Sequence, residues 1–165
     1  MTNKKKIPKE VHNYLSNAEY HLTTALALHE REHIADRIYL LLIALENVFL
    51  ADELHHHWIY DTKIPENVFK EHRIKLTGVR NPVIRVQFDK KKKRAKQILY
   101  LSAKKLEKLL NDCRYGPGKG AQSLREYFSN SRWFDDELIK EVENRISWAR
   151  MHVKISEDYI AGKLE

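Results

Sequence analysis

The strongest constraint on the fold is one unusually apolar stretch, residues 34–57. Its apolar positions recur at helical spacing but spread well beyond one stripe. They are Ile34, Ile38, Leu41, Leu42, Leu45, Val48 and Phe49. Because a helix that is apolar on several sides must be covered from several sides, this stretch predicts a helical bundle with residues 34–57 at its centre.

Two other long segments are the natural partners of this central helix. Residues 9–31 carry a narrower apolar stripe, and a break of only a few residues joins them to 34–57, which predicts an antiparallel hairpin. Residues 135–161 carry a heptad-like seam, and Asp135 or Asp136 is the expected N-cap of that helix. The seam consists of Ile139, Val142, Ile146, Ala149, Val153 and Ile160.

The remaining segments are shorter. Further helices are predicted over residues 65–77, which Pro65 would open, 90–112 and 121–129. Residues 83–88 alternate like a strand, but because no partner strand is evident we interpret them as an extended connection. Residues 114–120 (RYGPGKG) are expected to form a loop, and they lack the spacing of a phosphate-binding P-loop.

The overall composition agrees with one helical domain. A chain of 165 residues is long enough for one core, and 5 glycines and 4 prolines are few for a sheet-rich fold. The sequence has no internal repeat and no linker that would separate domains. We therefore predict an all-α bundle of five to six helices over residues 1–165, in which residues 1–8 are a flexible basic N-terminus.

Charge and cysteine content indicate the environment and the partners. Thirty basic against 23 acidic residues give a net charge of +7, which favours polyanionic partners and nucleic acid first. The single Cys113 excludes an intramolecular disulfide and fits a reducing compartment. No apolar run reaches the roughly 18 residues of a membrane span, and the start of the chain does not resemble a signal peptide. These features predict a cytoplasmic protein without a membrane segment.

Arg145 and His152 are the first candidate catalytic residues. They stand seven positions apart, so they lie on one face of the last helix, about two turns from each other. An arginine and a histidine beside a helix–helix groove suit phosphate binding and proton transfer. A salt-bridging arginine and a surface histidine would produce the same pattern.

Glu46, His72 and Lys75 form a second candidate group. Glu46 lies in the most apolar helix, where a carboxylate must be paired, protonated or turned toward a cavity. It is either a salt bridge that fixes helix packing or the anchor of a catalytic cation. His72 and Lys75 are one turn apart and would complete a polar cluster with it, although a solvated charged helix looks similar.

The run His55, His56 and His57 is conspicuous but poorly arranged for a metal. Successive helical residues diverge by about 100°, so three in a row cannot converge on one ion. One of them would need ligands from elsewhere, such as Glu53 or His72. The sequence contains no HExxH or comparable pair, and we assign neither a metal nor a cofactor.

Several short motifs resemble a known family. The opening hairpin, with Asn17-Ala18, Ala25, Ala35 and Ala44-Leu45-Glu46, resembles the HEPN superfamily of small helical domains. Three pieces resemble its abortive-infection, AbiV-like branch: Ala44-Leu45-Glu46, the His-x-x-Lys helix in FKEHRIKL, and Lys96-Gln97-Ile98-Leu99-Tyr100. The resemblance covers roughly residues 10–101. It differs at Asn47, where a second glutamate is common, and at Leu50, where a lysine often falls.

This resemblance implies a phage-defence or toxin-type protein. Many HEPN domains are metal-independent ribonucleases that use, across a dimer, an arginine and a histidine separated by four to six intervening residues. Arg145 and His152 have six intervening residues and match that motif. Other HEPN-like proteins only bind partners, so a dimeric non-catalytic module that binds a protein or nucleotide is the alternative.

The resemblance also directs attention to partners. The implied ones are RNA, a second copy of the chain, and a phage protein or antitoxin. The predicted RNA-binding run is Lys90, Lys91, Lys92, Lys93 and Arg94. Trp148, Ile155 and Tyr159 flank the apolar seam of the last helix and are expected to be buried in a two-fold contact. Packing of this face against helix 90–112 within the monomer would bury them equally well.

Overall fold

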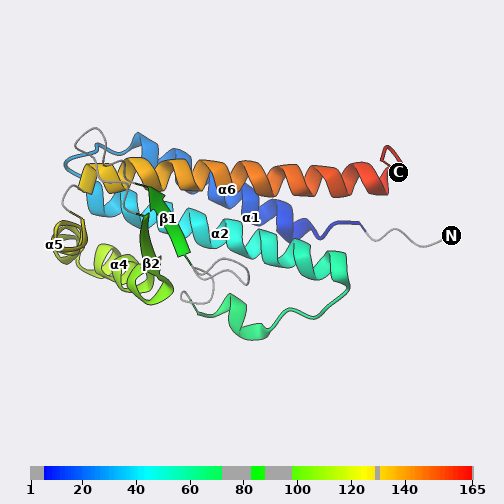
Figure 1. Cartoon of the computed structure of the whole chain (residues 1–165), viewed down its shortest axis with the longest axis horizontal. Helices are drawn as coiled ribbons and strands as arrows, with labels where there is room; N and C mark the ends of the chain where they lie inside the picture. The colour runs from blue at the N-terminus through cyan, green and yellow to red at the C-terminus, as the bar shows by residue number, and fades with distance from the viewer. Residues whose placement is uncertain (1–5, 72–82, 88–97, 129–130, 165) are drawn as a thin grey trace.

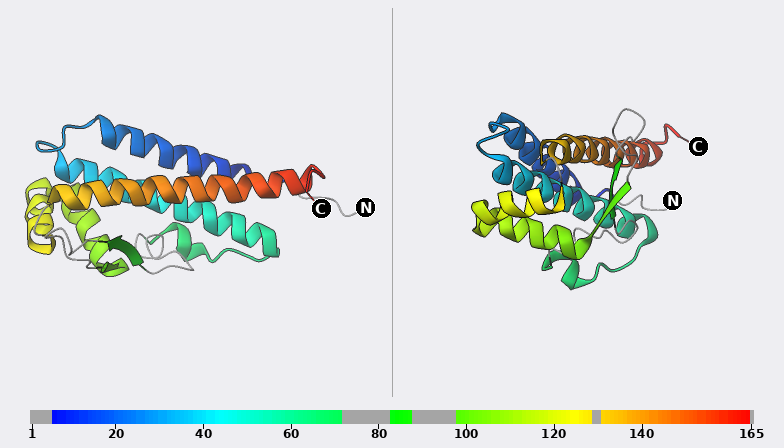
Figure 2. Two further views of the ribbon diagram at one scale, coloured as in Figure 1. Left: turned by 45° about the horizontal axis from the view of Figure 1, so that its top comes forward. Right: turned by 60° about the vertical axis from the view of Figure 1, so that its left-hand side comes forward.

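The computed structural model describes residues 6–71, 83–87, 98–128 and 131–164. Three long helices lie side by side, and the start of α1 and the end of α6 are at the same end of the molecule (Figures 1 and 2). They are α1 (Lys9–Ala27), α2 (Ile34–Tyr60) and α6 (Ser131–Ile160). Two shorter helices, α4 (Ala103–Tyr115) and α5 (Pro117–Tyr127), pack near the opposite end. The all-α class is thus confirmed, with five α-helices in the described residues.

Contacts between the long helices fix their relative directions. Arg150 of α6 binds Glu19 of α1, and Glu157 lies 3.6 Å from His12, so the later residue of α6 meets the earlier residue of α1. These two helices are therefore antiparallel. Arg37 of α2 meets Asp135, whereas His55 meets Ser156, so α2 and α6 run parallel.

The core confirms that the most apolar helix is the central one. Helix α2 contacts α1, α4, α5 and α6, and its Leu41, Leu42 and Leu45 are completely buried. The two long neighbouring helices, α1 and α6, bury most of the stripes that their sequences predict. The buried stripe of α1 is Val11, Leu15, Ala18 and Ala25, and that of α6 includes Val142, Ile146, Ala149 and Val153. Among the described residues, no helix is long and apolar enough to cross a membrane.

A small antiparallel ribbon corrects two of the predicted segments. Strand β1 (Val83–Gln87) pairs with β2 (Ile98–Ser102), so Val83 lies opposite Ser102 and Gln87 opposite Ile98. Residues 83–87 therefore have a partner strand, and within the predicted helix 90–112 residues 98–102 form that strand and α4 begins at Ala103. The prediction was wrong because a short apolar run such as ILYLS fits helical and strand spacing equally well.

The glycine-containing segment 114–120 is also not a loop. Only Gly116 separates α4 from α5, and Pro117 takes the first helical position, where it needs no amide hydrogen. Gly120 is buried against α4, and a Cβ there would lie 2.8 Å from Cys113 Cα. This glycine allows two helices to approach closely, so it is not a turn residue.

Other element boundaries differ from those predicted. Helix α1 ends at Ala27 rather than at 31, and Pro65 precedes a 3-10 turn, η1 (Glu66–Phe69), in the first part of the predicted helix 65–77. Residues 72–77 lie outside the described residues, so the rest of that helix stays a prediction. Helix α6 starts at Ser131, so Asp135 lies inside it and is not its N-cap. Because α6 starts earlier, the Asp135 side chain faces the core, where it binds Arg37.

Candidate functional site

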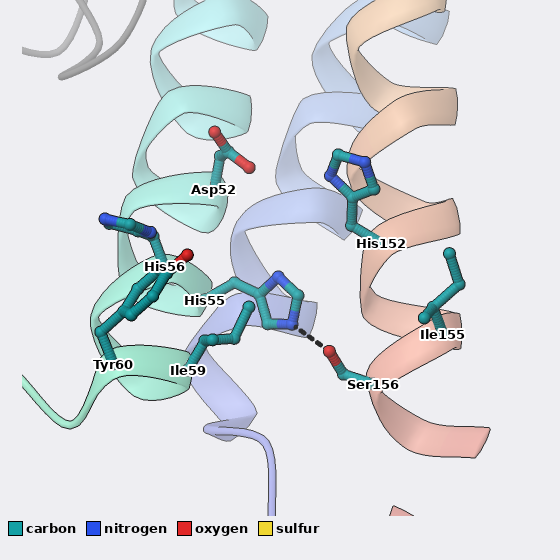
Figure 3. A pocket seen from close by; sticks show the side chains of 8 residues that line it. All are labelled: Asp52, His55, His56, Ile59, Tyr60, His152, Ile155 and Ser156. Atoms are coloured by element: carbon teal, nitrogen blue, oxygen red, sulfur yellow. Dashed lines mark hydrogen bonds between the residues drawn. The ribbon is translucent and has the colours of Figure 1, made fainter. Parts of the chain in front are cut away.

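A pocket of about 210 Å³ lies between the C-terminal halves of α2 and α6 (Figure 3). We call it the α2–α6 pocket. Helix α2 contributes Asp52, His55, His56, Ile59 and Tyr60, and helix α6 contributes His152, Ile155 and Ser156. Because the two helices run parallel, their C-terminal halves lie side by side at the same end of the molecule. The pocket brings one predicted catalytic residue, His152, next to two members of the histidine run.

The three consecutive histidines point in different directions, as the helical geometry requires. His55 is buried, and its Nε2 lies 2.9 Å from Ser156 Oγ. The ring of His56 meets Tyr60 edge to face at 4.5 Å. His57 turns away, to Glu53 Oε1 at 2.9 Å and Thr62 Oγ1 at 2.6 Å. Within the described ranges, no three histidine, cysteine or carboxylate side chains are grouped to hold a metal ion.

The surroundings of His55 favour the neutral form of its imidazole. Burial lowers its pKa, the negative charge of Asp52 opposes this shift, and the neighbouring His152 adds to it. Its ring stacks on Trp58 with a centroid distance of 5.7 Å. Because both the Ser156 contact and the Trp58 stack fix the ring, His55 forms the floor of the pocket and is hardly accessible to a ligand.

His152, by contrast, is exposed on the α6 wall of the pocket. Its ring meets Trp148 at a centroid distance of 5.8 Å with an interplanar angle of 70°. Asp52, also exposed, lies on the facing α2 wall (Figure 3). An accessible imidazole of this kind can accept or donate a proton for a bound ligand.

Arg145 lies two turns before His152 on α6 and is half-buried. Its Nε donates to Glu141 Oε1 at 2.8 Å, and its guanidinium lies 5.4 Å from the centre of the Phe49 ring. Both Arg145 and His152 therefore contact or face side chains of α2. The Glu141 contact holds the arginine in place and leaves its charge available to an anion only if the carboxylate is displaced or shared.

The other predicted site residues are not assembled here. Glu46 is buried, with 4% of its surface exposed, as its apolar surroundings predict. His72 and Lys75 lie outside the described residues, so their predicted cluster with Glu46 stays a prediction. The same holds for the predicted RNA-binding run Lys90, Lys91, Lys92, Lys93 and Arg94, which also lies outside them.

An apolar stripe runs along α6 next to the pocket. It consists of Trp148, Met151, Ile155 and Tyr159, which are 49–65% exposed, and Ile59 and Tyr60 of α2 continue it. The exposure of Trp148, Ile155 and Tyr159 agrees with the sequence prediction. Packing against helix 90–112 within the monomer was the alternative, and it does not bury these side chains.

Sequence reasoning missed the contribution of α2 to the site. Asp52, His56 and Tyr60 recur every four residues, so they share one face of the helix. That spacing was a usable signal, but nothing in the sequence indicated that this face lies opposite His152. The parallel pairing of α2 with α6, which brings the two faces together, appears only in the structure.

Comparison with known proteins gives no further assignment. No protein-family model, no curated protein and no solved structure matches this chain. The resemblance to HEPN domains therefore rests on the sequence motifs alone.

Proposed function

We propose that this chain is an AbiV-like HEPN protein of phage defence or toxin type and that it cleaves RNA without a metal ion. The observation that carries this proposal is the placement of Arg145 and His152 on one flank of α6, where His152 opens into the α2–α6 pocket. The net charge of +7 suits a polyanionic substrate.

The reaction needs one proton acceptor, one proton donor and one cation. A histidine removes the proton of the ribose 2′-hydroxyl, and the 2′-oxygen attacks the adjacent phosphorus. The bond from phosphorus to the 5′-oxygen breaks, and that oxygen leaves with a proton from an imidazolium. The products are a 2′,3′-cyclic phosphate and a free 5′-hydroxyl. Arg145 would stabilise the negative charge of the phosphorane.

A second copy of the chain supplies the other imidazole in this proposal. The apolar stripe of α6 would form a two-fold contact, because a small monomer gains by covering such a surface. The contact brings two Arg145–His152 pairs to one cleft, where one histidine acts as base and the other as acid.

The cleavage test uses purified full-length protein and single-stranded RNA in the presence of EDTA. We expect cleavage with 2′,3′-cyclic phosphate ends. Loss of the transition-state contacts should lower the rate at least about 100-fold in His152→Ala, and nearly as much in Arg145→Ala. His29→Ala and Arg31→Ala are matched controls, because these exposed residues lie between α1 and α2, away from the pocket.

Two outcomes would contradict the proposed site. Cleavage that persists in both His152→Ala and Arg145→Ala would exclude these residues as the catalytic pair. Activity that disappears on adding EDTA would exclude a metal-free reaction and return attention to the histidines of α2.

The dimer is tested by sedimentation equilibrium at micromolar concentration. We expect a mass near twice 19.6 kDa, reduced to that of a monomer by Trp148→Glu together with Ile155→Glu. Tyr115→Glu is the control, since Tyr115 is 73% exposed on α4, outside the stripe. A wild-type protein that is strictly monomeric would count against both the contact and the shared cleft.

A non-catalytic dimeric module is the second candidate function. The observation that favours it is the engagement of Arg145 by Glu141 and Phe49, which is what a structural arginine would show. Such a module would bind a protein, such as a phage product or an antitoxin, or a nucleotide. Absence of RNA cleavage by a dimeric wild-type protein would favour it over the enzyme.

A further inference from the structure

The proposed Arg145–His152 pair gives no role to the carboxylate of Asp52, which lines the α2–α6 pocket. Asp52 is exposed and lies across the pocket from His152 (Figure 3). Within the described part of the chain, no hydrogen bond or ion pair engages its carboxylate, although its charge acts on His55. An ionised carboxylate only accepts hydrogen bonds, so a ligand that complements it must present donors.

The remaining walls suit a flat ring. Tyr60 is 62% exposed and meets His56 edge to face, and Ile59 adds apolar contact. Nucleobases bind proteins by stacking on aromatic and imidazole rings. At about 210 Å³ the pocket is smaller than the sites of roughly 300–1,000 Å³ that enclose whole drug-sized ligands, so it suits one heterocycle.

The common bases differ in what they offer to a carboxylate. Guanine presents two adjacent donors on its Watson–Crick edge, the N1 hydrogen and the exocyclic amino group. Adenine and cytosine present an amino group beside a ring nitrogen that is an acceptor, and uracil presents one N–H between two carbonyl oxygens. A carboxylate has two acceptor oxygens side by side, so guanine is the base that satisfies both.

We propose that the α2–α6 pocket binds a guanine base of single-stranded RNA and that Asp52 is the residue that selects it. This inference rests on the proposed function for its substrate class, since an RNA nuclease must hold a nucleotide beside the phosphate it cleaves. The base stacks on Tyr60, and its Watson–Crick edge faces Asp52. The enzyme is then specific for guanine at the position that occupies the pocket.

The test measures binding separately from cleavage. Isothermal titration of the full-length protein with GMP, AMP, CMP and UMP should give the highest affinity for GMP. Asp52→Asn replaces one acceptor oxygen by a donor, so we expect GMP to bind at least about tenfold more weakly, while AMP changes less than about twofold. Glu143→Gln is the matched control, because it removes the same charge from an exposed site on α6 outside the pocket.

Each result bears on the proposal. Selective GMP binding that Asp52→Asn removes and Glu143→Gln keeps supports the site, even if the protein cleaves no RNA, in which case only the proposed nuclease function fails. Equal binding of the four nucleotides, or GMP binding that Asp52→Asn leaves intact, overturns it. RNA cleavage without guanine preference would overturn it as well and leave the nuclease function standing. Asp52 and Glu143 are both exposed, so both variants should unfold at close to the wild-type melting temperature.

Discussion

Polar side chains of α2 and α6 lie opposite one another near both ends of this helix pair. They are buried and paired at one end, and they are exposed at the other. At the closed end, Arg37 and Asp135 are 4% and 1% exposed, and Arg37 Nη2 lies 2.9 Å from Asp135 Oδ2. Arg37 Nη1 also donates to the carbonyl oxygens of Ala25 and Leu28, at 3.1 and 2.7 Å. At the open end, in the α2–α6 pocket, Asp52 and His152 are exposed and face each other across open space.

This difference separates a structural polar group from a functional candidate. The arginine at the closed end joins the end of α1, the start of α2 and the start of α6, and its hydrogen bonds compensate for its burial. Asp52 and His152 at the open end are exposed, so they remain able to interact with a ligand. Both ends carry charged residues, so the sequence alone would not distinguish the closed end from the open end.

The largest expected effect is the loss of one partner at the closed end. Arg37→Met leaves Asp135 buried without its cation and should lower the free energy of unfolding by about 3–5 kcal/mol in chemical denaturation. The double variant Arg37→Met, Asp135→Leu should recover most of this loss. His152→Ala, at the open end, should change stability by less than about 0.5 kcal/mol. Comparable losses at both ends would refute the distinction.

Glu46 lies on α2 between the closed and the open end. It is buried, as Arg37 and Asp135 of the closed end are. Glu46→Ala removes a buried carboxylate and should cost on the order of 3 kcal/mol in a thermal or denaturant melt. Glu46→Gln keeps the shape and part of the hydrogen bonding, so it should cost less. An unchanged melt for Glu46→Ala would show that the side chain has no central structural role.

Two glycines of α5 give a matched pair near the closed end. Gly120→Ala would place a Cβ within 2.9 Å of Cys113 Sγ, and it should destabilise by about 1–3 kcal/mol. Gly118 has no atom within 4 Å of an added Cβ, so Gly118→Ala should stabilise the helix by about 0.5–1 kcal/mol. Equal effects of the two variants would contradict the close approach of α4 and α5.

The smallest effect concerns acid stability at the open end. Burial lowers the pKa of His55 below its ordinary 6.5, so below that pH the unfolded chain takes up a proton that the folded protein does not. Stability should therefore fall as the pH drops from 7.5 to 5.5, by less than about 1.4 kcal/mol per unit of pKa difference. His55→Gln should reduce this dependence. It will not remove it, because burial also lowers the pKa of His21.

Long apolar patterns predicted most of the fold. The broad surface of residues 34–57, the stripe of α1 and the seam of α6 each became a buried face, because three or more helical turns give a repeat that no strand can imitate. The short segments were less certain. The apolar residues of Ile98–Ser102 fit both the helical and the strand period. Gly120 allows the close contact between α4 and α5, which the turn preference of glycine does not reveal.

The site was predicted in part for a similar reason. Spacing along α6 paired Arg145 with His152, and it correctly predicted the exposed Trp148. Which residues of α2 face them depends on the direction and register of two helices that are distant in sequence. Asp135 shows the same limit: an aspartate near a helix start resembles an N-cap, and only the packing of α6 reveals that it binds Arg37.

The burial of Cys113 makes the only thiol of the chain a reporter of local opening. Burial raises the pKa of this thiol to about 12, so it is protonated and shielded from reagents while α4 and α5 stay packed. A disulfide reagent can react with it only when the two helices separate. The rate of labelling under native conditions therefore measures how often this part of the molecule opens, without any engineered probe.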